Sequence, residues 1–335
     1  MSGGVDSTVA AKLLKDKGYD VSCVYFIMSD EHLKGVELAS SVSSSLLLSF
    51  SVKDMRKEFN NIIEYFCKEY CDGRTPNPCV LCNPTVKFKA LCDAADENGC
   101  RYIATGHYAR VEQTDNTFVL RKSESLERDQ SYMLYSLNQS QLSRLILPLG
   151  ALQKSVVRKI ALGDNLASAN APDSQEICFI PSGNYSEYIN SRGVFGKKGN
   201  FISPEGKTVC PHLGVEHYTV GQRRGLGVTF GKPVFIKQIL PSGDITLGYS
   251  GEEFNKGIIA INAKINPLFT LKSGDNYSVK LRSAAKPAEC TIGDVSCDSF
   301  SLIFDEPQRA PALGQSAVIY DGEYLVGGGI IDRCL

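Results

Sequence analysis

The first seven residues of the chain combine small residues and hydroxyl groups in a pattern suited to binding phosphate. Met1-Ser2-Gly3-Gly4-Val5-Asp6-Ser7 runs directly into 8–14, where apolar side chains recur at helical spacing before Gly18. Two glycines let the backbone curl so that successive amides face one anion, and the following helix adds its positive end. We predict a phosphate-binding loop leading into the first helix. A serine-capped helix with a glycine tip is the simpler alternative.

A second kind of phosphate motif, the P-loop, requires G-x-x-x-x-G-K-[ST]. The only Gly-Lys-Thr is Gly206-Lys207-Thr208, and Phe201 stands where the first glycine of the motif belongs. The residues Pro204-Glu205-Gly206 are typical of a tight turn. We predict a hairpin turn there and no nucleotide site.

Two further segments place cysteines where thiol chemistry could occur. The segment 73–83 holds two prolines and the pair Cys79-x-x-Cys82, so we expect a stiff, non-helical loop. This spacing suits half of a zinc site or a redox pair, and a zinc site would need the distant His212 and His217. The other segment is 173–180, where Ser-Gln-Glu precedes Cys178 in a strand-like run.

The composition is that of an ordinary globular chain. It has 335 residues, 43% of them hydrophobic and 22% charged, which is enough for two or three domains. We find no apolar run of membrane-spanning length and no signal peptide, so twelve cysteines indicate reduced thiols in the cytoplasm. The net charge of −1 requires any RNA contact to come from a local basic patch.

The order of elements predicts an α/β domain followed by β-rich sequence. The apolar run 21–27 reads as a strand buried on both faces, and Met28 follows at its carboxyl end, where doubly wound sheets bind ligands. Further strands are expected at 46–52 and 102–105, helices at 59–70 and 87–95, and a hairpin at 109–121. We predict a parallel-sheet catalytic domain at 1–183, a small β-rich central domain at 184–250 and a C-terminal β-barrel at 251–335.

Seven motifs occur in order and together resemble the tRNA-uridine 2-sulfurtransferase family (tRNA-specific 2-thiouridylase, MnmA), within the PP-loop ATP pyrophosphatase superfamily. They are SGGVDS at 2–7, GRTPNPCVLCN at 73–83, TGHYAR at 105–110, DQSY at 129–132, SQEICFI at 174–180, TVGQRRGLG at 219–227 and GQSAV at 314–318. The resemblance spans nearly the whole chain and implies a PP-loop fold for the first domain.

The resemblance also implies a reaction. The family adenylates O2 of the wobble uridine with ATP and delivers sulfur to C2 from a protein persulfide, with Mg²⁺ as the usual partner of the phosphates. By this resemblance Cys178 carries the persulfide and Cys82 attacks it, which forms a transient Cys82–Cys178 disulfide. The implied partners are tRNA and a cysteine desulfurase or sulfur-relay protein, and we expect a monomer without membrane contact.

The resemblance assigns binding roles residue by residue. The implied ATP contacts are Met1, Ser2, Gly3, Gly4, Val5, Asp6, Ser7, Met28 and Gly106. The implied tRNA contacts are Asn77, Pro78, Cys79, His107, Arg128, Asp129, Gln130, Arg282 and Gln315. Each has a simpler reading: the two arginines suit ordinary solvated side chains, and Asp129-Gln130-Ser131 suits a helix N-cap.

Two departures from the family pattern matter. Many relatives have Asp where this chain has Cys79, and that Asp is a candidate acid/base of the family. In this chain either another group handles the proton or none is needed. Alternatively, Cys79, Cys82 and Cys178 together hold a [4Fe–4S] cluster as in related PP-loop thiolases. We favour the persulfide route. Relatives also have a hydrophobic strand before the opening loop, and we expect that adding such a strand would raise stability and ATP affinity.

Two other functions stay open. Another PP-loop ligase, such as an amidating synthetase, would need neither Cys82 nor Cys178. A non-catalytic tRNA-binding protein would use the β-rich half to hold RNA and leave the nucleotide loop inactive.

Overall fold

The computed structural model describes residues 1–164, 166–169, 177–180 and 183–335, which form two compact units. Unit 1 consists of Met1–Ile62, Cys79–Gly183 and Glu323–Leu325. Unit 2 consists of Ile63–Pro78, Asn184–Gly322 and Val326–Leu335. Each unit is therefore built from segments that are far apart in the sequence.

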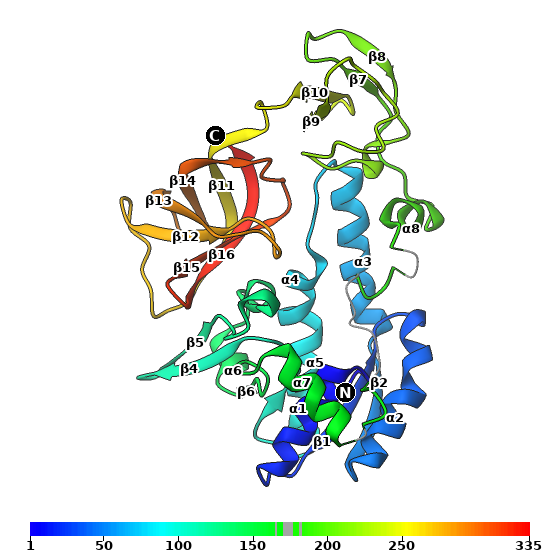
Figure 1. The fold of residues 1–335 in the computed structure, drawn as a ribbon, viewed down its shortest axis with the longest axis vertical. Coiled ribbons are helices and arrows are strands. Elements are labelled where there is room, and N and C mark those ends of the chain that lie inside the picture. The colour runs from blue at the N-terminus through cyan, green and yellow to red at the C-terminus, as the bar shows by residue number, and fades with distance from the viewer. Residues whose placement is uncertain (165, 170–176, 181–182) are drawn as a thin grey trace. The chain divides into compact units, whose positions relative to one another are not determined.

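Unit 1 alternates strands with helices (Figure 1). Its elements are α1 (Val5–Asp16), β1 (Ser22–Ile27), η1 (Asp30–Gly35), α2 (Val36–Ser45), β2 (Ser49–Asp54), α3 (Arg56–Cys71, which continues into unit 2), α4 (Pro78–Cys82), the π-helical turn η2 (Asn83–Lys87), α5 (Phe88–Glu97), β3 (Ile103–Ala104), β4 (Arg110–Thr114), β5 (Thr117–Arg121), η3 (Leu126–Arg128), η4 (Ser131–Leu134), α6 (Gln139–Leu142), β6 (Leu145–Ile146) and α7 (Lys154–Gly163).

Parallel pairing confirms the predicted α/β class. β1 lies alongside β2, from Ser22 opposite Ser49 to Ile27 opposite Asp54, and β3 lies alongside β6. Among the described residues these hydrogen bonds make two separate pairs, not one continuous sheet. The strand predicted at 46–52 begins later because Leu47 turns with a φ of +53° after α2. Likewise, the segment 73–83 predicted to be non-helical contains α4 from Pro78 onward, since proline is tolerated in a first helical turn.

The core of unit 1 forms where α1 presents one apolar face. Val5, Val9 and Ala10 are buried against residues that include Val157 of α7. Burying each such valine contributes about 1.5–3 kcal/mol, so this face fixes how α1 lies. Gly18 ends the segment with a φ of +83°, the left-handed conformation predicted for it.

Unit 2 is rich in β-structure. Its elements are α8 (Tyr185–Ser191), β7 (Asn200–Ile202), β8 (Thr208–Pro211), η5 (Val215–His217), β9 (Val234–Ile239), β10 (Ile245–Tyr249), β11 (Phe254–Ile265), β12 (Asn276–Lys280), β13 (Ala288–Val295), β14 (Ser299–Arg309), β15 (Ser316–Asp321) and β16 (Tyr324–Cys334). A small sheet has the order β8-β7-β10-β9, and a larger one has the order β11-β14-β13-β12-β15-β16 and closes by pairing β11 with β16. This confirms the predicted central β-rich domain and C-terminal barrel (Figure 1).

Two sequence alternatives in unit 2 are also decided. Gly206 turns between β7 and β8 with a φ of +77°, so the Gly-Lys-Thr segment is the predicted hairpin. Both ring nitrogens of His212 bond to backbone: Nδ1 accepts from Gly214 N at 3.2 Å, and Nε2 lies 2.8 Å from Gly243 O. His212 is therefore occupied as a structural residue and not as a zinc ligand. Within the described ranges, no helix has the length and apolar character needed to cross a membrane.

Candidate active site

The opening loop lies at the start of α1, and its hydroxyl groups form hydrogen bonds within the loop and the first turn of the helix. Gly3 has a φ of +80°, which glycine adopts without a Cβ clash. The Ser2 amide donates to Ser7 Oγ at 3.1 Å, while Ser7 Oγ and Thr8 Oγ1 donate to Gly4 O at 3.0 and 2.9 Å. α1 begins after Gly4, which is its N-cap residue, and in the described structure no side chain caps the helix. The serine-capped alternative is wrong, and the first amides of α1 are available to an anion.

Gly106 packs against the backbone of this loop. A Cβ on Gly106 would lie 2.8 Å from the Asp6 carbonyl carbon and 2.9 Å from the Ser7 nitrogen. Only glycine lets the chain after β3 approach the loop backbone this closely. The structure thus brings Gly106 together with the opening loop, as the assignment of both to ATP requires. Met28 is buried directly after β1.

Asp6 is held by two partners that the sequence did not suggest. Lys154 Nζ lies 2.7 and 2.8 Å from the two carboxylate oxygens, and Tyr108 donates its hydroxyl to Oδ1 at 2.7 Å. Lys154 also lies over the Tyr108 ring, 5.8 Å from its centroid. A charge-assisted pair of this kind fixes the orientation of the Asp6 side chain. No sequence pattern links Lys154 to the loop, since it lies 148 positions away.

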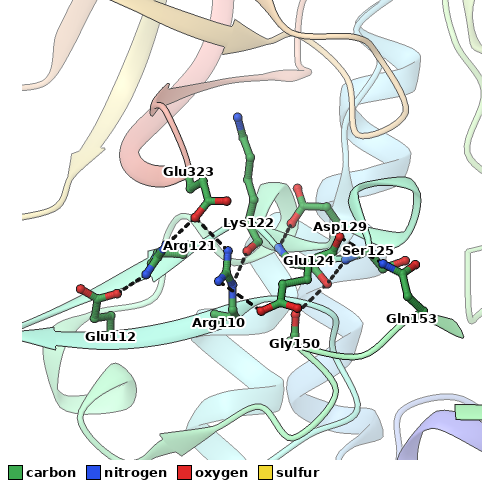
Figure 2. Close-up of polar contacts among 11 residues, drawn as sticks. Arg110, Glu112, Arg121, Lys122, Glu124, Ser125, Asp129, Gly150, Gln153 and Glu323 are labelled. Carbon is green, nitrogen blue, oxygen red and sulfur yellow. Dashed lines mark hydrogen bonds and ion pairs between the residues drawn. The ribbon is translucent and has the colours of Figure 1, made fainter. Parts of the chain in front are cut away.

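The stretch 129–130 supports the same tyrosine. Asp129 accepts hydrogen bonds from Ser123 N at 3.0 Å and from Ser131 Oγ at 2.8 Å. Gln130 Oε1 accepts the Tyr108 amide at 2.9 Å. These side chains therefore hold the loop that presents Tyr108 to Asp6. Figure 2 shows Asp129 beside Ser125, with Gly150 and Gln153 on the neighbouring segment.

His107 lies next to Gly106 and is a neutral imidazole. Its ring stacks on Phe88, with centroids 5.9 Å apart, and its Nδ1 lies 2.8 Å from Thr105 Oγ1. Burial, reinforced by the charge of Lys87, lowers the pKa of His107 to about 3. At neutral pH this ring can accept or donate a hydrogen bond without carrying charge.

Three thiols lie close enough in unit 1 to influence one another. Cys82 is buried in α4, Cys79 lies one turn before it, and Cys178 is exposed. Desolvation raises the pKa of Cys82 to about 12, with smaller upward contributions from Cys178 and Cys79 and an opposing effect of Lys87. Desolvation and then Cys79 raise the pKa of Cys178 to about 11. Although Cys178 has exposed surface, protein atoms crowd its sulfur, so both groups are protonated thiols at neutral pH.

The fold also fixes the backbone that carries Cys178. Phe179, the next residue, is buried and meets Phe59 edge-to-face, with centroids 5.5 Å apart. The lead-in residues 174–176 lie outside the described residues. All twelve cysteines are reduced. No cluster of three His, Cys, Asp or Glu side chains in the described part of the chain could hold a metal ion.

A second group of assigned residues belongs to unit 2. Gln315 Nε2 donates to Thr75 O at 2.7 Å, and the Thr75 amide donates to Leu313 O at 2.7 Å. Arg282 donates to Val220 O and Ala310 O at 3.4 and 3.3 Å. Gln315 therefore anchors the segment that leads to Asn77 and Pro78, and Arg282 bridges two backbone segments.

Family models match the chain in three segments. The tRNA methyl transferase HUP domain model matches 1–182, the tRNA methyl transferase PRC-barrel domain model matches 187–246, and the aminomethyltransferase beta-barrel domain model matches 261–331. The chain is 42% identical over its full length to tRNA-specific 2-thiouridylase MnmA of Clostridioides difficile, covering 97% of that protein. It is 41% identical to the Lachnoclostridium phytofermentans protein of that name, over 99% of this chain and 98% of the relative.

The chain belongs to the tRNA-specific 2-thiouridylase family. The family resemblance drawn from the motifs is thus confirmed, and so is the PP-loop HUP fold of the first domain. Within this thiouridylase family member, the geometry adds residues that motif reading missed. Lys154 and Tyr108 orient Asp6, and Tyr108 is the one that a motif, TGHYAR, could have indicated.

Proposed function

We propose that this chain carries out ATP-dependent 2-thiolation of the wobble uridine of tRNA. Its relatives are named tRNA-specific 2-thiouridylases, which supports the 2-thiolation of a tRNA uridine. The observation that carries the proposal is the proximity of Cys82 and Cys178, each of which lies in a family motif. The charge of Cys178 raises the pKa of Cys82, so the two sulfurs lie within electrostatic range. A pair of thiols in the same unit as a nucleotide loop is what sulfur transfer onto an activated base needs.

Adenylation is the first step of the proposed reaction. Met1–Ser7 would bind the phosphates of ATP through loop amides and hydroxyls, with Gly106 and Met28 completing the site. The close approach of Gly106 to Asp6 supports this arrangement. Mg²⁺ usually binds substrate phosphates with one or two carboxylates, and Asp6 is the carboxylate of this loop. The uridine O2 attacks the α-phosphorus of ATP, pyrophosphate leaves, and the oxygen becomes part of a good leaving group, AMP.

Sulfur transfer follows on the two cysteines. Cys178 accepts a sulfur atom from a cysteine desulfurase or relay protein and becomes a persulfide. The Cys82 thiolate attacks the inner sulfur of that persulfide, the S–S bond breaks, and the outer sulfur leaves as hydrosulfide. Hydrosulfide attacks C2 of the adenylated uridine and AMP leaves. The two cysteines end as a disulfide, which a thiol reductant reopens.

The remaining assignments place tRNA on both units. We propose that Asn77, Pro78 and Cys79 meet the target base, and that His107 lies near it as a neutral ring. The other proposed tRNA contacts are Arg128, Asp129, Gln130, Arg282 and Gln315. We propose domains at 1–183, 184–250 and 251–335, acting in the cytoplasm as a monomer.

The decisive experiment is mass analysis of tRNA incubated with the protein, Mg-ATP and a sulfide source. We expect a gain that corresponds to one oxygen-to-sulfur exchange at a uridine. With a persulfide donor in place of free sulfide, Cys82→Ser and Cys178→Ser should lose product but retain ATP–pyrophosphate exchange, while Cys297→Ser, at an exposed cysteine in unit 2, should keep both. Product formation that survives both active-site changes would favour a ligase that uses another nucleophile. Absence of both activities from the wild type would favour a tRNA-binding protein.

A further inference from the structure

The TVGQRRGLG segment at 219–227 is a family motif to which the proposed reaction gives no role. Its backbone is bonded to β9 on both sides of a turn: Gly221 N donates to Ile236 O at 2.8 Å, and Ile236 N donates to Gln222 O at 3.0 Å. The Gln222 side chain donates through Nε2 to Arg224 O at 3.0 Å. The segment is therefore fixed within unit 2.

Glu253, in the connection between β10 and β11, is a buried carboxylate that gathers two arginines from distant segments. Its side chain is 2% exposed, and its Oε1 lies 2.6 Å from Arg223 Nη2 and 3.3 Å from Arg309 Nε. Gly251 N donates to Oε2 at 2.6 Å. Since a buried charge needs such partners, Glu253 holds the two guanidinium groups at one point of unit 2.

The two arginines keep most of their hydrogen-bond donors and part of their charge. Their side chains are 42% and 49% exposed. Glu253 supplies one negative charge for two guanidinium groups, so one positive charge is left over. Arg223 uses only Nη2 and Arg309 only Nε, and within the described ranges their other N–H groups have no hydrogen-bond partner. Free guanidinium forks of this kind match the oxygen atoms of a phosphate group.

Two further side chains lie at the same point. Arg282 donates to Val220 O at 3.4 Å and to Ala310 O, on the residue after Arg309, at 3.3 Å. Phe254 is 51% exposed and pairs with Arg309 where β11 meets β14. Arginines beside an exposed aromatic ring are typical of RNA-binding surfaces, because the arginines contact phosphates and the ring stacks on a base.

We propose that Arg223 and Arg309 bind backbone phosphates of tRNA and that Phe254 stacks on an unpaired base. Glu253 is the positioning residue of this surface, and Arg282 borders it. The inference rests on the proposed function, whose tRNA contacts include Arg282 but none of the other four residues. The chain has a net charge of −1, so its attraction for a polyanion has to come from a local group of cations such as this one.

The test measures the binding of labelled, unmodified tRNA to the full-length protein by fluorescence anisotropy, without ATP, from ~50 to ~300 mM KCl. We expect Arg223→Gln and Arg309→Gln each to weaken binding about fivefold at the lowest salt. Each should also reduce the slope of log Kd against log salt by about 0.7–0.9, because one phosphate contact fewer releases fewer counterions. Phe254→Ala should weaken binding about fivefold and leave the slope unchanged, since base stacking releases no counterions.

The matched control is Arg101→Gln. Arg101 is an exposed arginine of unit 1 that precedes β3, whereas Gly106 follows that strand, so this variant should bind tRNA as the wild type does. Arg223→Lys keeps the charge and should keep the wild-type slope. Because Arg223→Gln takes a partner from a buried carboxylate, melting temperatures are compared, and Arg223→Gln with Glu253→Gln removes both charges and should show the same lower slope.

Wild-type affinity and slope in both Arg→Gln variants would overturn the inference. That holds even if these variants lost thiolation with a protein sulfur donor, which would instead mark the surface as a docking site for that protein. Unchanged affinity in Phe254→Ala would contradict the contact with a base. A wild type whose tRNA binding depends on Arg223 and Arg309 but that adds no sulfur would contradict the proposed reaction and leave this surface supported.

Discussion

At the scale of single residues, the tightest constraint in the site is the absence of a side chain at Gly106. A methyl group there would lie 2.8 Å from the Asp6 carbonyl carbon, a distance that Cβ atoms do not adopt, so the opening loop would have to move. We expect Gly106→Ala to weaken ATP binding at least about tenfold, which corresponds to about 1.4 kcal/mol. Calorimetric titration of the full chain with ATP measures this directly.

The matched control for this change is Gly163→Ala. A Cβ on Gly163 would meet no atom of the described residues within 4 Å, and Gly163 ends α7 in the same unit. This variant should bind ATP as the wild type does. Equal affinity in Gly106→Ala would show that the loop tolerates the displacement and does not bind the nucleotide as proposed.

The lowered pKa of His107 predicts how the stability of the protein depends on pH. Its pKa is lowered to about 3 by burial and by Lys87, whereas an unfolded histidine titrates near its ordinary value of 6.5. Between these values the unfolded chain binds more protons than the folded chain, so stability falls as the pH drops from about 6.5 toward 3. We expect His107→Gln to flatten this part of the curve, where each unit of the pKa difference corresponds to about 1.4 kcal/mol.

Urea unfolding of the two proteins at several pH values checks the prediction. The curves of unfolding free energy against pH should be parallel above pH 7, where the imidazole is neutral in both states. Below pH 7 the free energy of unfolding should fall more steeply for the wild type than for His107→Gln. Parallel curves down to pH 4 would show that the imidazole is protonated in the folded protein.

At the scale of elements, the π-helical turn η2 joins α4, which carries Cys82, to α5. Pro84→Ala would restore the N–H that can bond to Val80 O and would allow a regular α-turn, since interior proline costs about 3 kcal/mol in a helix. We expect 2-thiouridine formation to fall about tenfold while ATP–pyrophosphate exchange persists, because loss of the extra residue in the turn rotates α5 relative to α4, which carries Cys82, but leaves the nucleotide loop intact. The two assays on one preparation measure both quantities.

A suitable comparison for this variant is Pro211→Ala. Pro211 ends β8 in unit 2, outside the helix that carries Cys82. Thiolation that is unaffected by Pro84→Ala would mean that the turn is a packing feature without influence on sulfur transfer.

At the scale of the whole molecule, the chain returns to unit 1 for only the three residues 323–325. Figure 2 shows how they are held: Glu323 lies between Arg110 and Arg121 of the β4–β5 hairpin. Arg121 also pairs with Glu112, and the Tyr324 hydroxyl donates to Glu112 at 3.1 Å. Within unit 1 the network holds Glu323 and Tyr324 against the β4–β5 hairpin.

Glu323→Gln should weaken this network modestly. Glu323 is 55% exposed, so water screens its ion pairs, and we expect a small loss of stability that shrinks in high salt. Thermal unfolding at low and high salt measures it, with Glu306→Gln, at an exposed glutamate, as the control. A loss that is equal at both salt concentrations would mean that hydrogen bonding, not charge, holds Glu323.

The sequence by itself indicated the family and the class of fold. Residues 2–7 predicted a phosphate site because glycine and hydroxyl residues before a helix N-terminus offer hydrogen-bond donors to an anion. Seven ordered motifs indicated the family. The spacing of apolar residues predicted the α/β domain and the β-rich remainder. A helix or strand that is buried on one or both faces has apolar residues at a characteristic spacing in the sequence. These properties are local, and a linear pattern is sufficient to show them.

Only the tertiary structure decided which distant residues serve the site. Lys154 orients Asp6 and Gly106 packs on the loop because helices and strands far apart in the chain meet there. The pKa values of His107 and Cys82 depend on burial, which no spacing reveals.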